Sequence, residues 1–229
     1  MPAVGLWPVS RAMSNPVPAY PADVARKPNL LLLLAWTAVL TLMAYFVWKY
    51  ALHYFVFTPQ SYGTYFWSRI SWVVPHVAAG LVAILIGPLQ FWPRLRRDHL
   101  AFHRIAGRAY VTVVLVGAIA ALGLAAKIDS GPAYALGLAG LAVAWLTTTG
   151  MAFIAIRRKN VEQHRQWMIR SYVVTFAFVT FRLCDDAMHR LQILSDDERS
   201  KVLAWACWAV PLLVTELSLQ SRAVFKTRG

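Results

Sequence analysis

Apolar residues follow one another in six long stretches, separated by short polar segments. Each stretch has about the 20 residues that a helix needs to cross the hydrocarbon core of a bilayer. The expected spans are Leu30 to Leu52, Ser71 to Phe91, Gly107 to Ala126, Pro132 to Ile156, Trp167 to Cys184 and Val202 to Leu219. Because helices satisfy their own backbone hydrogen bonds in lipid, the pattern predicts an all-α polytopic transmembrane helix bundle.

The composition agrees with a membrane location. Hydrophobic residues make up 59% of the chain and charged residues only 14%, whereas soluble domains carry about 25% charged residues. The net charge of +13 does not indicate nucleic acid as a partner, since the basic residues lie in short segments between apolar spans. That placement is the orientation signal of a membrane protein, and the lipid bilayer is the expected partner.

Every second segment between the spans is rich in basic residues. The basic segments hold Arg94, Arg96, Arg97 and Arg104, then Arg157, Arg158, Lys159 and Arg165, then Arg222, Lys226 and Arg228. The segment between the fifth and sixth spans instead holds Asp185, Asp186, Asp196, Asp197 and Glu198. Lysine and arginine favour the cytoplasmic side, so both termini are expected there, in a plasma or inner membrane, with anionic lipid headgroups at the basic segments.

The chain divides into three parts by composition. Residues 1–28 are rich in proline and predict a flexible cytoplasmic tail, residues 29–220 form the transmembrane domain, and residues 221–229 form a cytoplasmic tail. In the fourth span, Ala133 with Gly137 and Gly140 with Ala144 have the spacing of a face that packs closely on another helix. The two cysteines, Cys184 and Cys207, lack the spacing of a metal site and are interpreted as packing residues.

One motif appears twice. The copies are His103-Arg104-Ile105-Ala106-Gly107-Arg108-Ala109-Tyr110 and His164-Arg165-Gln166-Trp167-Met168-Ile169-Arg170-Ser171-Tyr172. Each is His-Arg, three or four residues, then Arg-x-Tyr, and each follows a basic segment and opens a span. The copies are 61 residues apart, or two spans, which predicts a duplicated helical hairpin and a four-helix core.

The histidines of the motif are placed on helix faces. His103, Gly107 and Tyr110 share one face, and His164, Met168 and Ser171 repeat that spacing. The arginines have an ordinary interpretation as orientation signals or lipid-facing anchors. Topology does not require a His-Arg pair at both places, so a specific role and a purely structural role both stay open for the histidines.

A second polar group is expected at the outer side. His76 lies near the outer end of the second span and Arg182 near the outer end of the fifth. An arginine in a span usually faces the bundle interior and has a partner. Asp185 and Asp186 follow Arg182 at i+3 and i+4 and are the predicted partners, either as a plain ion pair or as a polar site with His76.

At these residues the chain resembles the DUF2306 family of predicted membrane proteins. The matching segments are His76-Val77-Ala78-Ala79-Gly80, Gly87-Pro88-Leu89-Gln90-Phe91, both copies of the His-Arg motif, and Phe181-Arg182-Leu183. The resemblance covers about residues 72–185 and implies a four-helix core, with the first and sixth spans outside it. The family name records no activity, so the resemblance implies a fold and not a reaction.

The chain is also loosely similar to cytochrome b561-type proteins, in which histidine pairs hold haem between helices of a bundle. This similarity implies His103 and His164 as axial ligands of the iron of one haem b. The rest of the implied cofactor site is Arg104, Arg108, Arg165 and Arg170 toward the propionates, with Tyr110 and Tyr172. The fourth span has no histidine, which departs from a two-haem pattern.

Two functions fit these residues. One is a haem-binding or quinone-linked electron carrier that uses His103 and His164 and has a redox partner. The other is a non-enzymatic transporter, lipid-binding protein or subunit of a membrane complex. An enzyme acting on a lipid-soluble substrate is a third class, but the sequence offers no nucleophile in a catalytic setting, so enzyme activity stays open.

Overall fold

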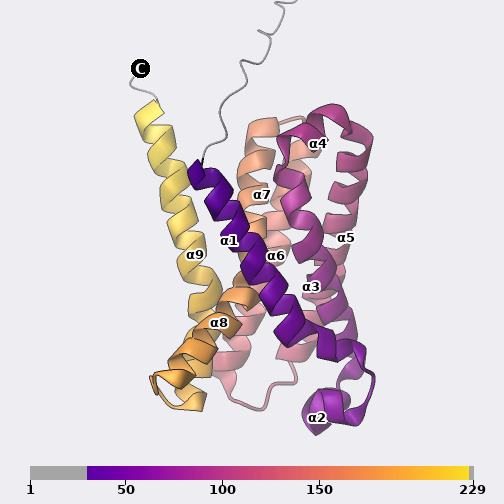
Figure 1. Ribbon diagram of the computed structural model, residues 1–229, viewed down its shortest axis with the longest axis vertical. Helices are drawn as coiled ribbons and strands as arrows, with labels where there is room; N and C mark the ends of the chain where they lie inside the picture. The colour runs from indigo at the N-terminus through magenta and orange to yellow at the C-terminus, as the bar shows by residue number, and fades with distance from the viewer. Residues whose placement is uncertain (1–29, 227–229) are drawn as a thin grey trace, which may run out of the picture. The chain divides into compact units, whose positions relative to one another are not determined.

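The computed structural model describes residues 30–226, and the regular secondary structure in this range is helical (Figure 1). The elements are α1 (Leu30–Phe46), η1 (Val47–Ala51), η2 (Leu52–Phe55), α2 (Pro59–Trp67), α3 (Ile70–Phe91), α4 (Pro93–Asp98), α5 (Leu100–Ala125), α6 (Pro132–Arg157), α7 (Val161–Thr175), α8 (Ala177–Arg190) and α9 (Asp196–Lys226). The chain divides at Ala38 into two compact units, and the helix bundle belongs to the second, residues 39–229. The predicted tail 1–28 lies outside the described residues.

The predicted polytopic helix bundle is confirmed. Among residues 30–226, six helical segments are long and apolar enough to cross a membrane. They are Leu33–Phe55, Ile70–Phe91, Leu100–Ala125, Pro132–Arg157, Val161–Arg190 and Asp196–Ser221. Large apolar side chains point outward along them, and Leu136 and Leu213 are 61% and 59% exposed. Lipid rather than water is the solvent that such a surface requires.

Three spans differ from their expected limits. The third begins at Leu100, so the first His-Arg motif lies inside helix α5, and α9 begins at Asp196 and continues to Lys226. Hydropathy marks only the part of a helix that lipid covers, while the hydrogen-bonded backbone continues through polar ends. The fifth span is interrupted at Phe176, which separates α7 from α8.

The two ends of the bundle differ in charge. Figure 1 shows α4 at the same end as the start of α7, and α2 and the tip of α8 at the opposite end. We name the first the basic end, formed by α4, the start of α5 and the loop between α6 and α7. The second is the mixed-charge end, formed by α2, the loop between α5 and α6, and the junction of α8 and α9.

Helices α3 and α5 pack most extensively on each other, followed by α6 and α7. Helix α5 also packs on α6, and α9 packs against α6, α7 and α8. The core between them contains Tyr110, Val114, Trp145, Met168 and Phe181. Both cysteines are free thiols, and Cys207 is buried in this core as a packing residue. The duplication of a hairpin stays a prediction.

Small residues of α6 let α9 approach closely, as their spacing predicts. A Cβ atom on Gly137 would lie 2.8 Å from the Cβ atom of Ala204 and 2.9 Å from Nε1 of Trp205. Gly140 lies against Trp208 in the same way. The Trp205 indole also donates a hydrogen bond of 3.0 Å to the carbonyl of Ala133. This face of α6 is therefore filled by α9.

An ion pair within the spans joins α7 to α9. The Arg170 guanidinium donates to Glu216 Oε2 from Nε at 2.7 Å and from Nη2 at 2.6 Å. It also lies over the Trp167 ring, 4.7 Å from the ring centre. The Arg170 side chain is 8% exposed and that of Glu216 is 41% exposed. Charges inside a membrane are costly unless paired, so this pair accounts for an arginine at this depth.

We predict that Gly137→Ala destabilises the protein, because the added methyl group has no room against Ala204. Overpacking of a well-packed core costs about 1–3 kcal/mol. Thermal unfolding of the detergent-purified protein measures the loss. Gly150→Ala in the same helix is the control, since nothing lies within 4 Å of its added Cβ. Equal melting temperatures for the two variants would contradict the proposed packing.

We predict that Glu216→Gln destabilises the protein by about 3 kcal/mol, the low end for breaking a buried ion pair, because Arg170 loses its counter-ion. The control is Lys201→Gln, which removes the Lys201–Asp197 pair on the same helix. That pair is more exposed, so its loss is expected to cost less than about 1 kcal/mol. If Lys201→Gln lowers the melting temperature as much as Glu216→Gln does, the prediction is wrong.

Candidate functional site

A cavity of about 440 Å³ lies toward the mixed-charge end of the bundle. Its lining comes from the end of α1, η1, η2, α2, α3, α5, the loop between α5 and α6, α6, α7 and α8, and most of it is apolar. The polar side chains on which a ligand could bond include Tyr50, Tyr54, His76, Tyr134, Thr175 and Arg182. A largely apolar cavity with a few convergent polar groups is the usual form of a small-molecule site.

The interruption of the fifth span lies at this cavity. Val174 and Thr175 at the end of α7 and Phe178, Val179 and Arg182 in α8 all line it. Breaks in membrane helices are tolerated where the chain is covered by protein or lines a cavity, and discontinuous helices often form binding sites. The sequence did not indicate this break, since no proline or glycine stands near Phe176.

His76 is held by a hydrogen bond between α3 and α5. Its Nδ1 lies 2.9 Å from the carbonyl oxygen of Gly117 in α5, and its ring meets Phe178 edge-on at 5.5 Å. A carbonyl can only accept, so Nδ1 carries the hydrogen. In the neutral imidazole Nε2 is then an acceptor, and it is the ring nitrogen left for a ligand.

Arg182 shares the cavity with His76 but not with the aspartates predicted as its partners. Asp185 pairs with Arg199 at 2.6 Å, and Asp186 accepts hydrogen bonds from Lys49 and Tyr50. Among residues 30–226 no carboxylate forms an ion pair with Arg182, whose guanidinium lies 6.0 Å from the centre of the Tyr50 ring. The predicted pairing is therefore wrong, because the two carboxylates are bonded to basic side chains of other elements, Arg199 and Lys49.

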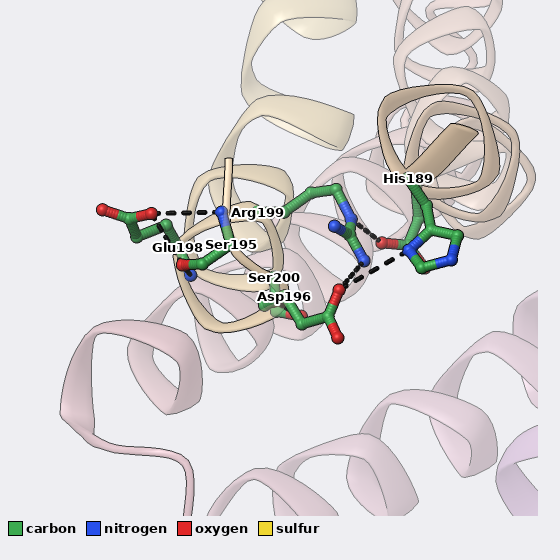
Figure 2. A network of polar contacts seen from close by, with 7 residues as sticks. His189, Ser195, Asp196, Glu198, Arg199 and Ser200 are labelled. Carbon is green, nitrogen blue, oxygen red and sulfur yellow. Dashed lines mark hydrogen bonds and ion pairs between the residues drawn. The ribbon is translucent and has the colours of Figure 1, made fainter. Parts of the chain in front are cut away.

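The Arg199 network joins the end of α8 to the start of α9 (Figure 2). Arg199 donates from Nη2 to Asp196 Oδ1 at 2.7 Å in addition to its bond to Asp185, and its side chain is 7% exposed. His189 Nδ1 lies 3.6 Å from the same Asp196 oxygen. We name these two ion pairs of Arg199 the arginine clamp. Its bond to Asp185 accounts for the absence of that residue from the cavity lining.

Ser195 and Glu198 form a capping box at the first turn of α9. The Ser195 hydroxyl and backbone N–H donate to Glu198 Oε2, at 2.6 and 3.1 Å, and the Glu198 N–H returns a bond of 3.4 Å to the serine oxygen. The pattern satisfies backbone donors that a helix start leaves without partners. Figure 2 shows both residues beside the arginine clamp, so the acidic segment has a structural role.

Helix α2 lines the cavity at the mixed-charge end with Tyr65 and Phe66. It is held by Tyr62, which is buried and whose hydroxyl donates to the backbone carbonyl of Tyr54. Burial raises the pKa of the Tyr62 phenol, so it stays protonated and able to donate at physiological pH. Arg69 adds a second tie, through Nη2 to Asp129 at 3.1 Å.

The two motif histidines lie at the basic end and do not line the large cavity. His164 Nδ1 lies 2.8 Å from the carbonyl oxygen of Ala152 in α6. His103 Nδ1 is buried without a hydrogen-bond partner, as is Nε2 of Gln90. Gln90 lies beside Gly107, one turn along α5 from His103. The basic end thus contains a second polar group, formed by Gln90, His103 and His164.

The extra residue in the second copy of the motif changes what its arginine and tyrosine contact. One residue turns the following positions by about 100° around a helix. Arg108 is exposed, whereas Arg170 is buried against Glu216. Ser171 takes the place that corresponds to Tyr110, and Tyr172 turns toward α3, where its ring contacts Gly87 and its hydroxyl lies 3.3 Å from the Ile84 carbonyl.

The four arginines predicted to bind cofactor propionates differ in exposure. Arg104, Arg108 and Arg165 are exposed, as expected for anchors at the membrane surface. Arg170 is already bonded to Glu216. Glu216 is not among the site residues predicted from the sequence, although a lone carboxylate within an apolar span is itself a signal of a buried partner.

The two motif tyrosines lie in separate places, Tyr110 buried and Tyr172 partly buried. Tyr110 is completely buried, and its hydroxyl contacts Ser171 and Thr175 of α7. Tyr172 contacts α3, as described above. Neither lies in the large cavity. Among residues 30–226 no group of three or more histidine, cysteine, aspartate or glutamate side chains has the arrangement of a metal site.

Comparison with known proteins gives one match. The model of a family described as "Predicted membrane protein (DUF2306)" matches residues 73–219. No curated protein and no solved structure matches the chain. The prediction that the sixth span lies outside the family is wrong, since the match includes most of α9, which packs on α6, α7 and α8. The match spans well over half of the sequence, so the chain belongs to the DUF2306 family of predicted membrane proteins.

Proposed function

We propose that this membrane protein binds a quinone-type molecule in the 440 Å³ cavity. The observation that carries the proposal is the presence of His76 and Arg182 in one largely apolar cavity. The volume falls within the range of about 300–1,000 Å³ typical of small-molecule sites. The apolar and aromatic lining suits a ring system that partitions into lipid.

The two polar groups suit the two oxygens of such a ligand. Nε2 of a neutral His76 would accept a hydrogen bond from the hydroxyl of the reduced, quinol form. Arg182, which has no carboxylate partner among the described residues, would donate to the other oxygen. A neutral histidine beside a quinol hydroxyl is also placed to take up its proton, as a redox-linked site requires.

We predict that decylubiquinol binds the purified protein and that His76→Ala and Arg182→Gln each weaken binding. Loss of a hydrogen bond in a cavity costs about 1.5 kcal/mol, or about tenfold in Kd. Isothermal titration calorimetry in detergent measures Kd. His189→Ala and Arg190→Gln are matched controls, since both residues are exposed, lie on α8 and do not line the cavity.

The outcomes separate this function from its alternative. Absence of binding by both the oxidised and the reduced probe would refute the proposal. A phospholipid can be tested in the same way. If it binds without competing with the oxidised or the reduced probe, and Arg182→Gln weakens its binding, the result would instead favour the non-redox alternative of a lipid-binding or transport protein. Affinities that the control variants reduce as much as the cavity variants do would also count against the proposal.

Haem at His103 and His164 is a second candidate, favoured by one observation. The Nδ1 of His164 bonds to the Ala152 carbonyl, which fixes the tautomer that leaves Nε2 free. Metal-ligating histidines commonly hold their other ring nitrogen in this way. His103 lies at the same end of the bundle with a buried Nδ1 that has no partner. Two histidines suffice for a b-type haem, which would make the protein an electron carrier.

We predict for this candidate a Soret band and sharp reduced α and β bands in protein purified from haem-replete cells. His103→Ala and His164→Ala should abolish them, because each removes one axial ligand. His99→Ala is the matched control, since His99 is an exposed histidine at the same end. A colourless wild-type protein with no extractable haem excludes this candidate and leaves the cavity proposal untouched.

We propose that the basic end faces the cytoplasm in a plasma or inner membrane. The segments with the most arginine lie together there, and lysine and arginine are retained on that side during insertion. The exposed Arg104, Arg108 and Arg165 would then meet anionic lipid headgroups.

A further inference from the structure

Four hydroxyl groups form a hydrogen-bonded chain in the centre of the bundle. Thr149 Oγ1 lies 2.7 Å from Ser171 Oγ, which lies 2.9 Å from the Tyr110 hydroxyl. The Tyr110 hydroxyl lies 2.7 Å from Thr175 Oγ1. The chain joins three consecutive helices, α5, α6 and α7. The sequence offered no indication of it, because these residues come from three different spans.

The chain has a single direction. Thr175 Oγ1 donates to the Ser171 carbonyl at 2.8 Å and accepts from the Trp145 indole at 2.8 Å. Its hydrogen is therefore in use, so the Tyr110 hydroxyl donates to it. Ser171 then donates to Tyr110, and Thr149 donates to Ser171. Hydrogen bonds aligned in one direction polarise one another, and this is the arrangement along which a proton can hop.

One end of the chain opens on the cavity. Thr175 and Trp145 both line it, so the last hydroxyl of the chain can pass a proton to a ligand or to water in the cavity. The remaining members are buried, with exposures of 0% for Tyr110 and Ser171 and 2% for Thr149.

The other end approaches the basic end of the bundle. Thr149 stands three residues before Ala152 on α6, and residues at that spacing lie on the same face of a helix. The carbonyl of Ala152 accepts the bond from His164 Nδ1. One water molecule between Thr149 and His164 would connect the His164 imidazole to the chain and so complete a path from the basic end to the cavity.

We propose that this hydroxyl chain conducts protons from the basic end to the cavity. A proton enters at Thr149, and each hydroxyl oxygen accepts a proton from the neighbour that donates to it and passes its own hydrogen to the next. Thr175 turns from the Ser171 carbonyl and releases its hydrogen to an acceptor in the cavity, and the hydroxyls then rotate back before the next proton. One proton enters at one end, one leaves at the other, and no electron moves. The path does not depend on which molecule occupies the cavity.

The test is proton flux into vesicles that contain the full-length protein. Phospholipid vesicles loaded with pyranine are given a potassium gradient, and valinomycin sets the membrane potential that drives protons. Wild-type protein is expected to acidify the interior faster than protein-free vesicles do. Thr149→Val removes one hydroxyl at constant shape and should reduce the rate to that of protein-free vesicles.

Thr148→Val is the matched control. Thr148 is the preceding residue of the same helix and is equally buried, but its hydroxyl bonds to the carbonyls of Ala144 and Trp145 of its own helix and is outside the chain. Its flux should equal that of the wild type. Thr149→Ser keeps the hydroxyl and should retain flux. Tyr110→Phe interrupts the chain at a second place and serves as the test if Thr149→Val does not fold.

Flux no greater than that of protein-free vesicles, or equal losses in Thr148→Val and Thr149→Val, would overturn the proposal and leave the hydroxyls as packing contacts between helices. Failure here is distinguishable from failure of the quinone site. Thr149 does not line the cavity, so Thr149→Val should leave the Kd of decylubiquinol unchanged.

Discussion

The absence of water inside a bilayer governs the polar interactions of this protein. A polar group in a span must find a partner within the protein, since lipid offers none. His76 and His164 bond to carbonyls of neighbouring helices, and Arg170 pairs with Glu216. These bonds connect α3 to α5, α6 to α7, and α7 to α9. The partners that hold the helices together also decide which polar atoms are left for a ligand.

Polar groups that could meet a ligand occur at both ends of the bundle. At the mixed-charge end, Arg182 lines the cavity because Asp185 and Asp186 are bonded to Arg199 and to Lys49. At the basic end, buried nitrogens of Gln90 and His103 have no partner. The central hydroxyl chain has Thr175 at the cavity end. Its other end is Thr149, on the same helix as Ala152, whose carbonyl is bonded to His164. The two polar regions and the chain together form a candidate route across the bundle.

The two copies of the repeated motif differ in what their residues contact. The two histidines keep the same position at the start of their helices. The residue inserted in the second copy turns its arginine and tyrosine by about 100° around the helix axis. Arg108 therefore faces the surroundings and Arg170 the core, while Ser171 stands where the second tyrosine would otherwise be. The hydrogen bond between Tyr110 and Ser171 follows from that difference.

The sequence alone determined the membrane class, the six spans and the grouping of arginines, because lipid imposes a length and a composition on each helix independently of its neighbours. It also indicated that His76 and Arg182 are polar residues within the spans. Only the tertiary structure decided their partners and the cavity that they share. It also decided the break at Phe176. Contacts between different helices form the Arg170–Glu216 pair and the chain of Tyr110, Ser171 and Thr149. Such contacts depend on the rotation and packing of each helix against the others, which hydropathy along one helix does not specify.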